Sequence, residues 1–184
     1  MRQQFRTATS AAGVLLLCAF AVPYAANAAD KADSDEVSSL LSSAKTQAYQ
    51  VREDAAQLEA FTRTNASWES HAATVGQMRE HINALGKEEA KLAGARDEAS
   101  PWQQVAIDRI RPLLKELASN TEATINFLNK NRKQLTTGDY KDYVEANADL
   151  SSRLSEMIGD FVDYGRTKDR LERLTKKLEV PSVE

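Results

Sequence analysis

The chain contains little of the chemistry on which most catalytic and cofactor sites depend. It has 184 residues but only one cysteine and two histidines, and its seven glycines are scattered rather than gathered in a phosphate-binding loop. One cysteine excludes an intrachain disulfide, a thiolate metal site and the Cys-x-x-Cys-His attachment sequence of a c-type haem. The chain also has no nucleophile elbow and no dinucleotide-binding fingerprint. An enzymatic function is therefore the one that the sequence supports least.

Long apolar runs are absent as well, and the one apolar stretch, residues 11–22, has the pattern of an export signal. Arg2 and Arg6 precede it, and Ala26-Asn27-Ala28 follows it as a small-x-small cleavage site. A membrane-spanning helix needs about 20 apolar residues, so an uncleaved anchor is the weaker interpretation. We therefore expect cleavage after Ala28 and a protein that acts in the periplasm or outside the cell.

Cleavage after Ala28 would also remove the single cysteine, Cys18. In a lipoprotein signal the lipidated cysteine follows a small residue, whereas Leu17 stands before Cys18, so we expect no lipid anchor. Removal of the signal takes away this thiol and two of the 24 basic residues, while all 27 acidic residues remain. The resulting acidic chain argues against nucleic-acid binding, which requires a basic surface.

Four later segments show apolar residues alternately three and four positions apart, the spacing of amphipathic helices with coiled-coil-like seams. No segment of useful length has the period of two that a strand would show. We predict one all-α domain at residues 29–184, an antiparallel up-down-up-down bundle of four long helices. The helices are expected at approximately 34–63, 67–93, 101–135 and 139–178.

Each predicted helix has an apolar seam that should face the bundle centre. The first seam is Val37, Leu41, Ala44, Ala48, Val51, Ala55 and Leu58. The second is Trp68, His71, Val75, Met78, Ile82, Leu85 and Leu92. The third is Ile107, Ile110, Leu114, Leu117, Thr121, Thr124, Leu128, Asn131 and Leu135. The fourth is Tyr140, Tyr143, Asn147, Leu150, Leu154, Met157, Phe161, Tyr164, Leu171 and Leu178.

Capping residues and charges support this topology. Ser100-Pro101-Trp102-Gln103 combines an N-cap serine, a proline at the first helical position and a capping-box glutamine, so a helix should start there. Antiparallel packing would bring an acidic helix start and a basic helix end together at one end of the bundle. The acidic start contains Asp30, Asp33, Asp35 and Glu36, and the basic end contains Arg166, Lys168, Arg170, Arg173, Lys176 and Lys177.

The metal and haem sites known from helical bundles are not expected in this chain. A di-iron bundle needs Glu-x-x-His pairs, but Glu69 and Glu80 stand two and one residues before the histidines that follow them. Met78 and His81 are three residues apart and could share a soft metal ion. A methionine in a seam is ordinary packing, so we interpret Met78 as core and His81 as solvated, and predict no metal and no cofactor.

One group of polar residues is predicted to lie inside the apolar bundle, near one end. These residues fall on the predicted seams at similar depths and are His71, Thr124, Asn131, Tyr143 and Asn147. Two interpretations stay open for this polar layer. It is either a hydrogen-bonded network that fixes the register of the helices, or a small-ligand pocket with His71 as its polar anchor, ringed by Phe61, Trp68 and Phe127.

The leading functional hypothesis is an exported, non-enzymatic bundle that acts through protein contacts in the cell envelope. Its partner would be another envelope protein or a second copy, and the seam alanines Ala44, Ala48 and Ala55 would allow close approach or leave a shallow groove for a helix. The alternatives are small-ligand or metal binding near His71, and electrostatic association with anionic surfaces through the basic end of the fourth helix. No nucleic acid is expected, and contact with a membrane would be peripheral.

Overall fold

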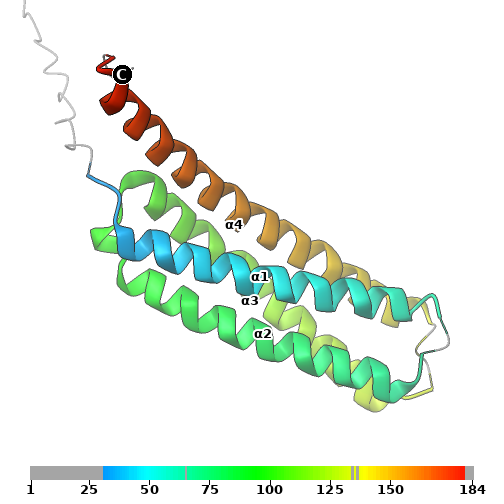
Figure 1. Cartoon of the computed structure of the whole chain (residues 1–184). Helices are drawn as coiled ribbons and strands as arrows, with labels where there is room; N and C mark the ends of the chain where they lie inside the picture. Colours follow the sequence, from blue (N-terminus) through cyan, green and yellow to red (C-terminus); the bar gives the residue numbers. More distant parts are fainter. Residues whose placement is uncertain (1–30, 65, 134, 136, 181–184) are drawn as a thin grey trace, which may run out of the picture.

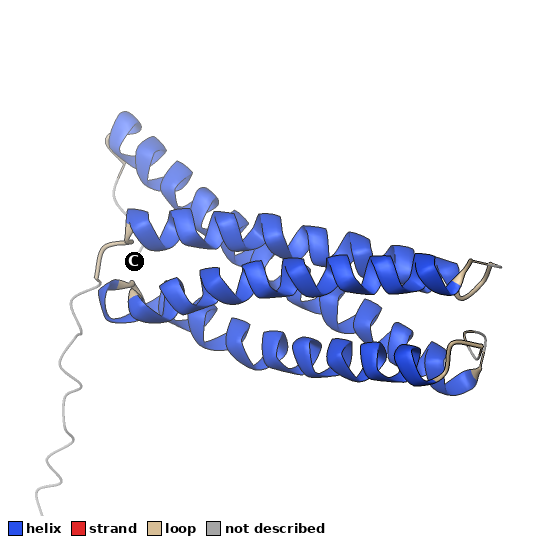
Figure 2. Ribbon diagram, turned by 90° about the horizontal axis from the view of Figure 1, so that it is seen from below, coloured by secondary structure: helices blue, strands red, loops and turns tan. Residues whose placement is uncertain are grey.

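The computed structural model describes residues 31–64, 66–133, 135 and 137–180. Four helices form an antiparallel bundle (Figure 1), with a short 3-10 turn, η1 (Arg96–Glu98), between the second and the third. They are α1 (Asp35–Phe61), α2 (Trp68–Gly94), α3 (Pro101–Lys130) and α4 (Gly138–Leu178). The described residues contain no strand (Figure 2), so the predicted all-α bundle is confirmed. The predicted export signal, residues 1–28, lies outside the described part of the chain.

Each helix packs against its neighbours in sequence, and α4 closes the ring by packing against α1. The seam predicted for α1 is confirmed, because all seven of its residues are buried. The alanines Ala44, Ala48 and Ala55 belong to this buried set, so they permit close helix packing within the bundle and leave no groove for another helix. None of the helices in the described part of the chain is both long enough and apolar enough to cross a membrane.

The predicted third helix is too long at its C-terminal end, because α3 ends at Lys130 rather than near residue 135. Asn131 is the C-cap, with φ −126° and ψ 49°, outside the helical region. Its backbone N–H and its side-chain Nδ2 both donate to the Phe127 carbonyl, at 2.9 and 3.0 Å. Asparagine side chains compete in this way for backbone partners, so the apolar spacing that continues to Leu135 does not extend the helix.

The inward face of α4 agrees with the predicted seam at Tyr140, Asn147, Leu150 and Leu154, but it is rotated by one residue at three other levels. Val144, Ile158 and Val162 are buried, whereas their neighbours Tyr143, Met157 and Phe161 are half-buried. Two apolar rows therefore run side by side on α4. The β-branched row is compact and stiff and fills the bundle centre, and the bulkier row covers the edge of the bundle.

The C-terminal part of α4 extends beyond the other helices (Figure 1). The last residue that α4 buries is Val162, and Asp169 to Leu178 continue for roughly 15 Å at 1.5 Å per residue. Tyr164, Leu171 and Leu178 were predicted in the seam, and this prediction is wrong, because all three are exposed. The heptad spacing thus continues past the point at which the bundle has helices to pack against it.

Candidate functional site

The predicted polar layer is present, but it consists of two separate clusters. In the first cluster His71 is 1% exposed, and its Nδ1 lies 2.8 Å from the hydroxyl of Tyr140. The ring of Phe61 packs edge-on against His71, and the ring of Phe127 stacks on Tyr140. Burial lowers the pKa of His71 and raises the pKa of Tyr140, so both side chains are neutral partners of one another.

The second cluster joins α3 and α4 around the buried amide of Asn147. Its Nδ2 donates to Thr124 Oγ1 at 2.8 Å, and its Oδ1 lies 2.9 Å from the Thr121 hydroxyl. Both threonine hydroxyls also lie within donating distance of a backbone carbonyl of their own helix, Leu117 for Thr121 and Asn120 for Thr124. The Asn147 amide thus uses its oxygen and its nitrogen, as a register-fixing residue does.

Two of the residues predicted for the layer lie outside both clusters. Asn131 caps the end of α3, and Tyr143 is half-buried beside Phe127, with 5.7 Å between the ring centroids. The Tyr143 carbonyl accepts a hydrogen bond from Asn120, whereas its hydroxyl makes no contact with His71. The partner of His71 is instead Tyr140, which also belongs to the predicted seam of α4 and is fully buried.

The aromatic residues predicted to surround a pocket at His71 instead contact neighbouring side chains and the backbone. Phe61 contacts the imidazole, and Phe127 contacts Tyr140. Trp68 donates from Nε1 to the Leu128 carbonyl at 3.1 Å, and the Arg132 guanidinium lies over its ring at 4.2 Å. The geometry of His71, Thr124 and Asn147 therefore favours the structural interpretation of the layer over a ligand pocket.

A hydrogen bond between Asp54 of α1 and His81 of α2 was not predicted from the sequence. Asp54 Oδ2 lies 2.6 Å from His81 Nδ1, and Asp54 is buried while His81 is half-buried. Burial raises the pKa of Asp54, although the hydrogen bond and the charge of His81 oppose this shift. The view of His81 as solvated is thus wrong, whereas Met78 is a core residue as predicted.

The end of the bundle from which α4 projects is held together by one glutamine. The Oε1 atom of Gln103 accepts from the backbone N–H groups of Ser34 and Ser100, each at 3.0 Å. Its Nε2 donates to the Ser34 carbonyl at 2.9 Å and to Ser38 Oγ at 3.0 Å. Gln103 therefore caps α3 and also ties the start of α1 to it.

Asp33 links α3 and α4 at the same end of the bundle. Its Oδ1 accepts from Trp102 Nε1 at 2.7 Å, and its Oδ2 pairs with Lys168 Nζ at 3.0 Å. Burial acts to raise the pKa of Asp33, but the neighbouring side chains of Ser100, Lys168 and Trp102 lower it below its ordinary value. The predicted match between the acidic start of α1 and the basic part of α4 is thus confirmed for this pair.

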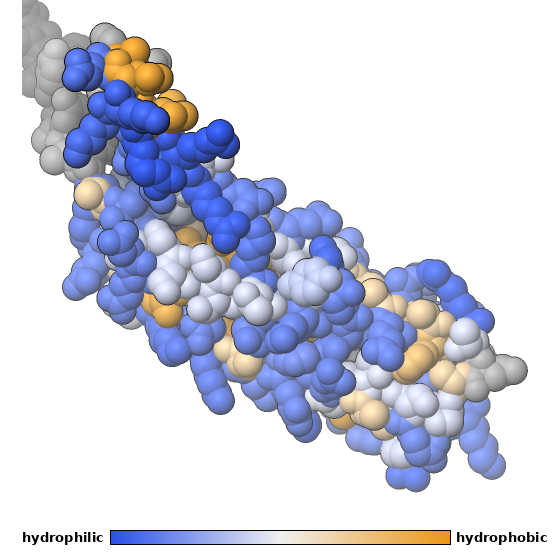
Figure 3. Space-filling model, in the orientation of Figure 1, coloured by the Kyte–Doolittle hydropathy of each residue, from blue (hydrophilic) through white to orange (hydrophobic). Residues whose placement is uncertain are grey.

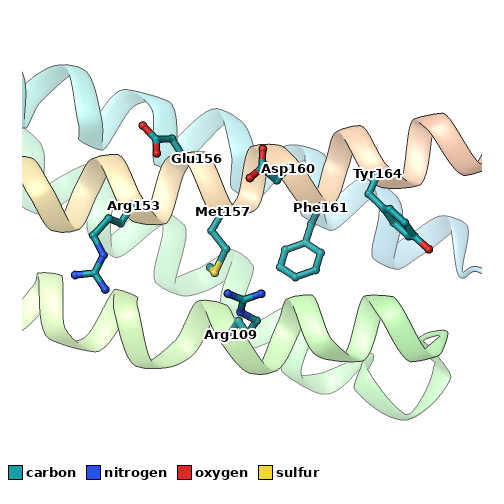
Figure 4. A pocket seen from close by; sticks show the side chains of 7 residues that line it. All are labelled: Arg109, Arg153, Glu156, Met157, Asp160, Phe161 and Tyr164. Carbon is teal, nitrogen blue, oxygen red and sulfur yellow. The ribbon is translucent and has the colours of Figure 1, made fainter.

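A groove lies on the outer side of α4, where α4 meets α3 (Figure 4). It has a volume of about 510 Å³ and is lined by Arg109 of α3 and by Arg153, Glu156, Met157, Asp160, Phe161 and Tyr164 of α4. Met157 and Phe161 point from α4 toward Arg109, whose guanidinium lies 5.7 Å from the Phe161 ring centroid. The groove thus has an apolar floor between charged side chains of both signs.

The exposed leucines of the projecting segment continue the line of this groove. Leu171, Leu174 and Leu178 follow Tyr164 by 7, 10 and 14 residues, which keeps them on one side of a helix with 3.6 residues per turn. Figure 3 shows hydrophobic atoms at the tip of the projecting segment among hydrophilic ones. We call the surface that contains Met157, Phe161, Tyr164, Leu171, Leu174 and Leu178 the outer α4 face, and it is the candidate functional site.

No metal site is found among the described residues, and comparison with known proteins identifies no relative. In the described ranges, no group of three or more His, Cys, Asp or Glu side chains could hold a metal ion. The Asp54 and His81 pair has no third ligand of these types beside it. Comparison of the chain with protein family models, with curated proteins and with solved structures finds no match.

Proposed function

We propose that this chain is a non-enzymatic protein of the cell envelope that acts by binding another protein through the outer α4 face. The observation that carries the proposal is the exposure of Leu171, Leu174 and Leu178, at 60, 43 and 64%. A leucine side chain gains about 1.5–3 kcal/mol when it is fully buried, and three exposed leucines in a row mark a contact surface. The export pattern of residues 1–28 supports a location in the envelope.

The shape of the outer α4 face suits a helical partner. Apolar side chains at helical spacing pack into the groove of a partner helix, or receive its side chains in turn. The face starts in the groove at Met157 and ends on the projecting segment at Leu178, roughly 32 Å away at 1.5 Å per residue. This length is enough for a contact of about six helical turns.

Site-specific photo-crosslinking tests the proposal. A photoreactive amino acid replaces Leu174 in one variant and Lys87, an exposed residue on α2, in a matched control. On irradiation of intact cells, we expect position 174 to form discrete protein adducts in the envelope fraction, and position 87 to form none of them. A second substitution, Leu171→Asp, should abolish the adducts. If positions 174 and 87 give the same adducts, or none, the outer α4 face is not a protein-binding surface.

A second candidate function is reversible binding to anionic lipid surfaces, favoured by the basic residues beside the exposed leucines. Arg170, Arg173, Lys176 and Lys177 are all exposed on the projecting segment. Basic amphipathic helices bind anionic headgroups by charge and by insertion of their apolar side chains. Flotation with phosphatidylglycerol vesicles should then show binding that salt weakens and that Leu174→Asp weakens further, with no binding to phosphatidylcholine vesicles. Equal binding to both kinds of vesicle would contradict this function.

A further inference from the structure

We infer that the partner of the outer α4 face is a second copy of this chain, packed so that the two α4 helices run antiparallel. This inference rests on the proposed function, because it specifies which protein the face binds. It is carried by the arrangement of charges along one border of the face.

The border consists of residues seven positions apart, Glu156, Asp163, Arg170 and Lys177, all of them exposed. Residues seven apart lie two turns apart on the same side of a helix. The row is therefore acidic along the part of α4 that packs in the bundle and basic along the part that projects. The sign of the charge changes between Asp163 and Arg170.

Such a row is complementary to itself when it runs in the opposite direction. In an antiparallel pair related by a two-fold axis near Arg166, Asp163 lies beside Arg170 of the other copy. Glu156 then lies beside Lys177 of the other copy, and the two-fold axis repeats both pairs. Four intermolecular ion pairs thus follow from a single register.

Asp163 is available for this contact although it has partners within its own chain. Its Oδ1 pairs with Lys45 of α1 at 2.9 Å and with Arg166 at 3.6 Å. The side chain is still 63% exposed, and a carboxylate has a second oxygen that can accept a further donor. Glu156 has no ion pair within the described residues.

The same register brings the apolar residues of the two copies together. The axis that pairs Asp163 with Arg170 places Leu174 of one copy about half a turn from the level of Met157 of the other, and it places Leu178 about half a turn from the level of Arg153. The exposed leucines of each copy thereby lie along the groove of the other. The charges on the border and the apolar residues on the face fit the same alignment to within about half a helical turn, although they are different sets of side chains.

The two bundles do not obstruct this arrangement. Ile158 and Val162 are buried in the bundle, whereas Tyr164 and Leu171 on the outer α4 face are 54 and 60% exposed. Two α4 helices in contact through their outer faces therefore have their bundles on opposite sides. The contact uses the same surface of both copies, so it closes at a dimer and does not continue into a filament.

An anionic lipid surface accounts for only half of the border. It would attract Arg170 and Lys177 but repel Glu156 and Asp163, which lie on the same side of the same helix. A second copy uses both halves. The self-complementary order of the charges is the reason to prefer a dimer over lipid binding.

Sedimentation analysis of the mature chain, residues 29–184, with a charge-exchange design tests the dimer. The acidic variant carries Arg170→Glu and Lys177→Glu, and the basic variant carries Glu156→Lys and Asp163→Lys. We expect the wild type to be a dimer, and each variant to dissociate at least tenfold more readily, because like charges then face one another. A mixture of the two variants should form a heterodimer, because an entirely acidic row meets an entirely basic one. Lys87→Glu serves as the matched control and should remain dimeric.

The outcomes separate this inference from the proposed function. A wild type that stays monomeric at every concentration, or two monomeric variants that fail to combine, would overturn the dimer. In the first case, crosslinking at position 174 to a different protein would still support the proposed function. Circular dichroism of each variant, with a helical spectrum like that of the wild type, shows that a loss of dimer is not a loss of fold. Vesicle binding by a monomeric wild type would assign the projecting segment to lipid and likewise overturn the dimer.

Discussion

A Cβ atom on Gly165 of α4 would lie 2.8 Å from Cη2 of Trp102 on α3, closer than real atoms approach. The indole cannot move aside freely, because its Nε1 is bonded to Asp33 and its ring packs edge-on against Tyr164. The missing side chain at Gly165 thus lets α4 come close to α3 at the point where Lys168 reaches Asp33.

Replacement of this glycine should therefore destabilise the protein, in contrast to glycine replacement elsewhere. Gly86 lies within α2, and a Cβ there would have no neighbour within 4 Å. We expect Gly86→Ala to raise the free energy of unfolding by about 0.5–1 kcal/mol through helix propensity. Gly165→Ala should lower it by about 1–2 kcal/mol, because Trp102 is displaced. Urea denaturation measures the free energy of unfolding of both variants. An equal increase in the two would contradict the close packing of Trp102 against Gly165.

The isosteric change Gln103→Glu should be strongly destabilising at neutral pH. Gln103 is fully buried, and a carboxylate there would lose both donor bonds and place an anion against the Ser34 carbonyl. We expect a loss of about 2 kcal/mol or more in the free energy of unfolding. The deficit should shrink as the pH falls, because a protonated glutamate regains one donor. The control is Gln104→Glu, which removes one bond to the Ala99 carbonyl and should cost about 1 kcal/mol or less.

The stability of the protein should decrease as the pH falls below about 6.5, and His71 should cause part of the decrease. Burial lowers the pKa of His71 in the folded chain below its ordinary value near 6.5. Below that pH the unfolded chain binds a proton that the folded chain does not, so acid favours unfolding. The effect is at most about 1.4 kcal/mol per pH unit. The free energy of unfolding of His71→Gln should depend less steeply on pH between 7 and 5, and parallel curves would show that His71 takes up its proton in the folded chain.

The second polar cluster should tolerate an apolar residue at position 147 better than a charge. In Asn147→Val, the hydroxyls of Thr121 and Thr124 keep their backbone acceptors, so no donor is left without a partner. We expect this variant to lose about 1 kcal/mol or less. In Asn147→Asp, a buried anion faces two hydroxyl groups with no cation beside it, and the loss should be about 3 kcal/mol or more. Thermal unfolding of the two variants compares them directly, and a larger loss for the valine variant would mean that Asn147 itself holds the helices together.

Heptad spacing predicts the bundle well where one apolar row stands alone, as on α1. It fails on α4, where Met157 and Ile158 belong to two adjacent rows and spacing does not decide which row faces inward. Tyr140 is buried beside His71 as the spacing predicts, whereas Tyr143 is absent from the cluster because Val144 rather than Tyr143 faces inward. The end of α3 is a local effect of the Asn131 side chain that spacing cannot reveal.

The sequence interpretation missed two features for a different reason. Asp54 and His81 flank the seams rather than lie in them, so neither is marked by apolar spacing. Only a comparison of depths at flanking positions would have paired them. The outer α4 face was not predicted, because Leu171 and Leu178 keep the heptad spacing of the α4 seam. Nothing in that spacing indicates that the other helices have ended.

The Gln103 amide joins the first turn of α3 to Ser34, the N-cap of α1, which lies 69 residues earlier in the chain, and the Asp33–Lys168 pair spans 135 residues. The first turn of α1 therefore cannot complete its hydrogen bonds until α3 has docked beside it, nor its ion pair until most of α4 exists. A chain that emerges from a ribosome N-terminus first must hold the start of its first helix unfinished for nearly the whole of synthesis. Contacts of such long range form late, because the intervening chain must be ordered first. The order of assembly is thus opposite to the order of the chain at this end, where the earliest helix is the last to be completed.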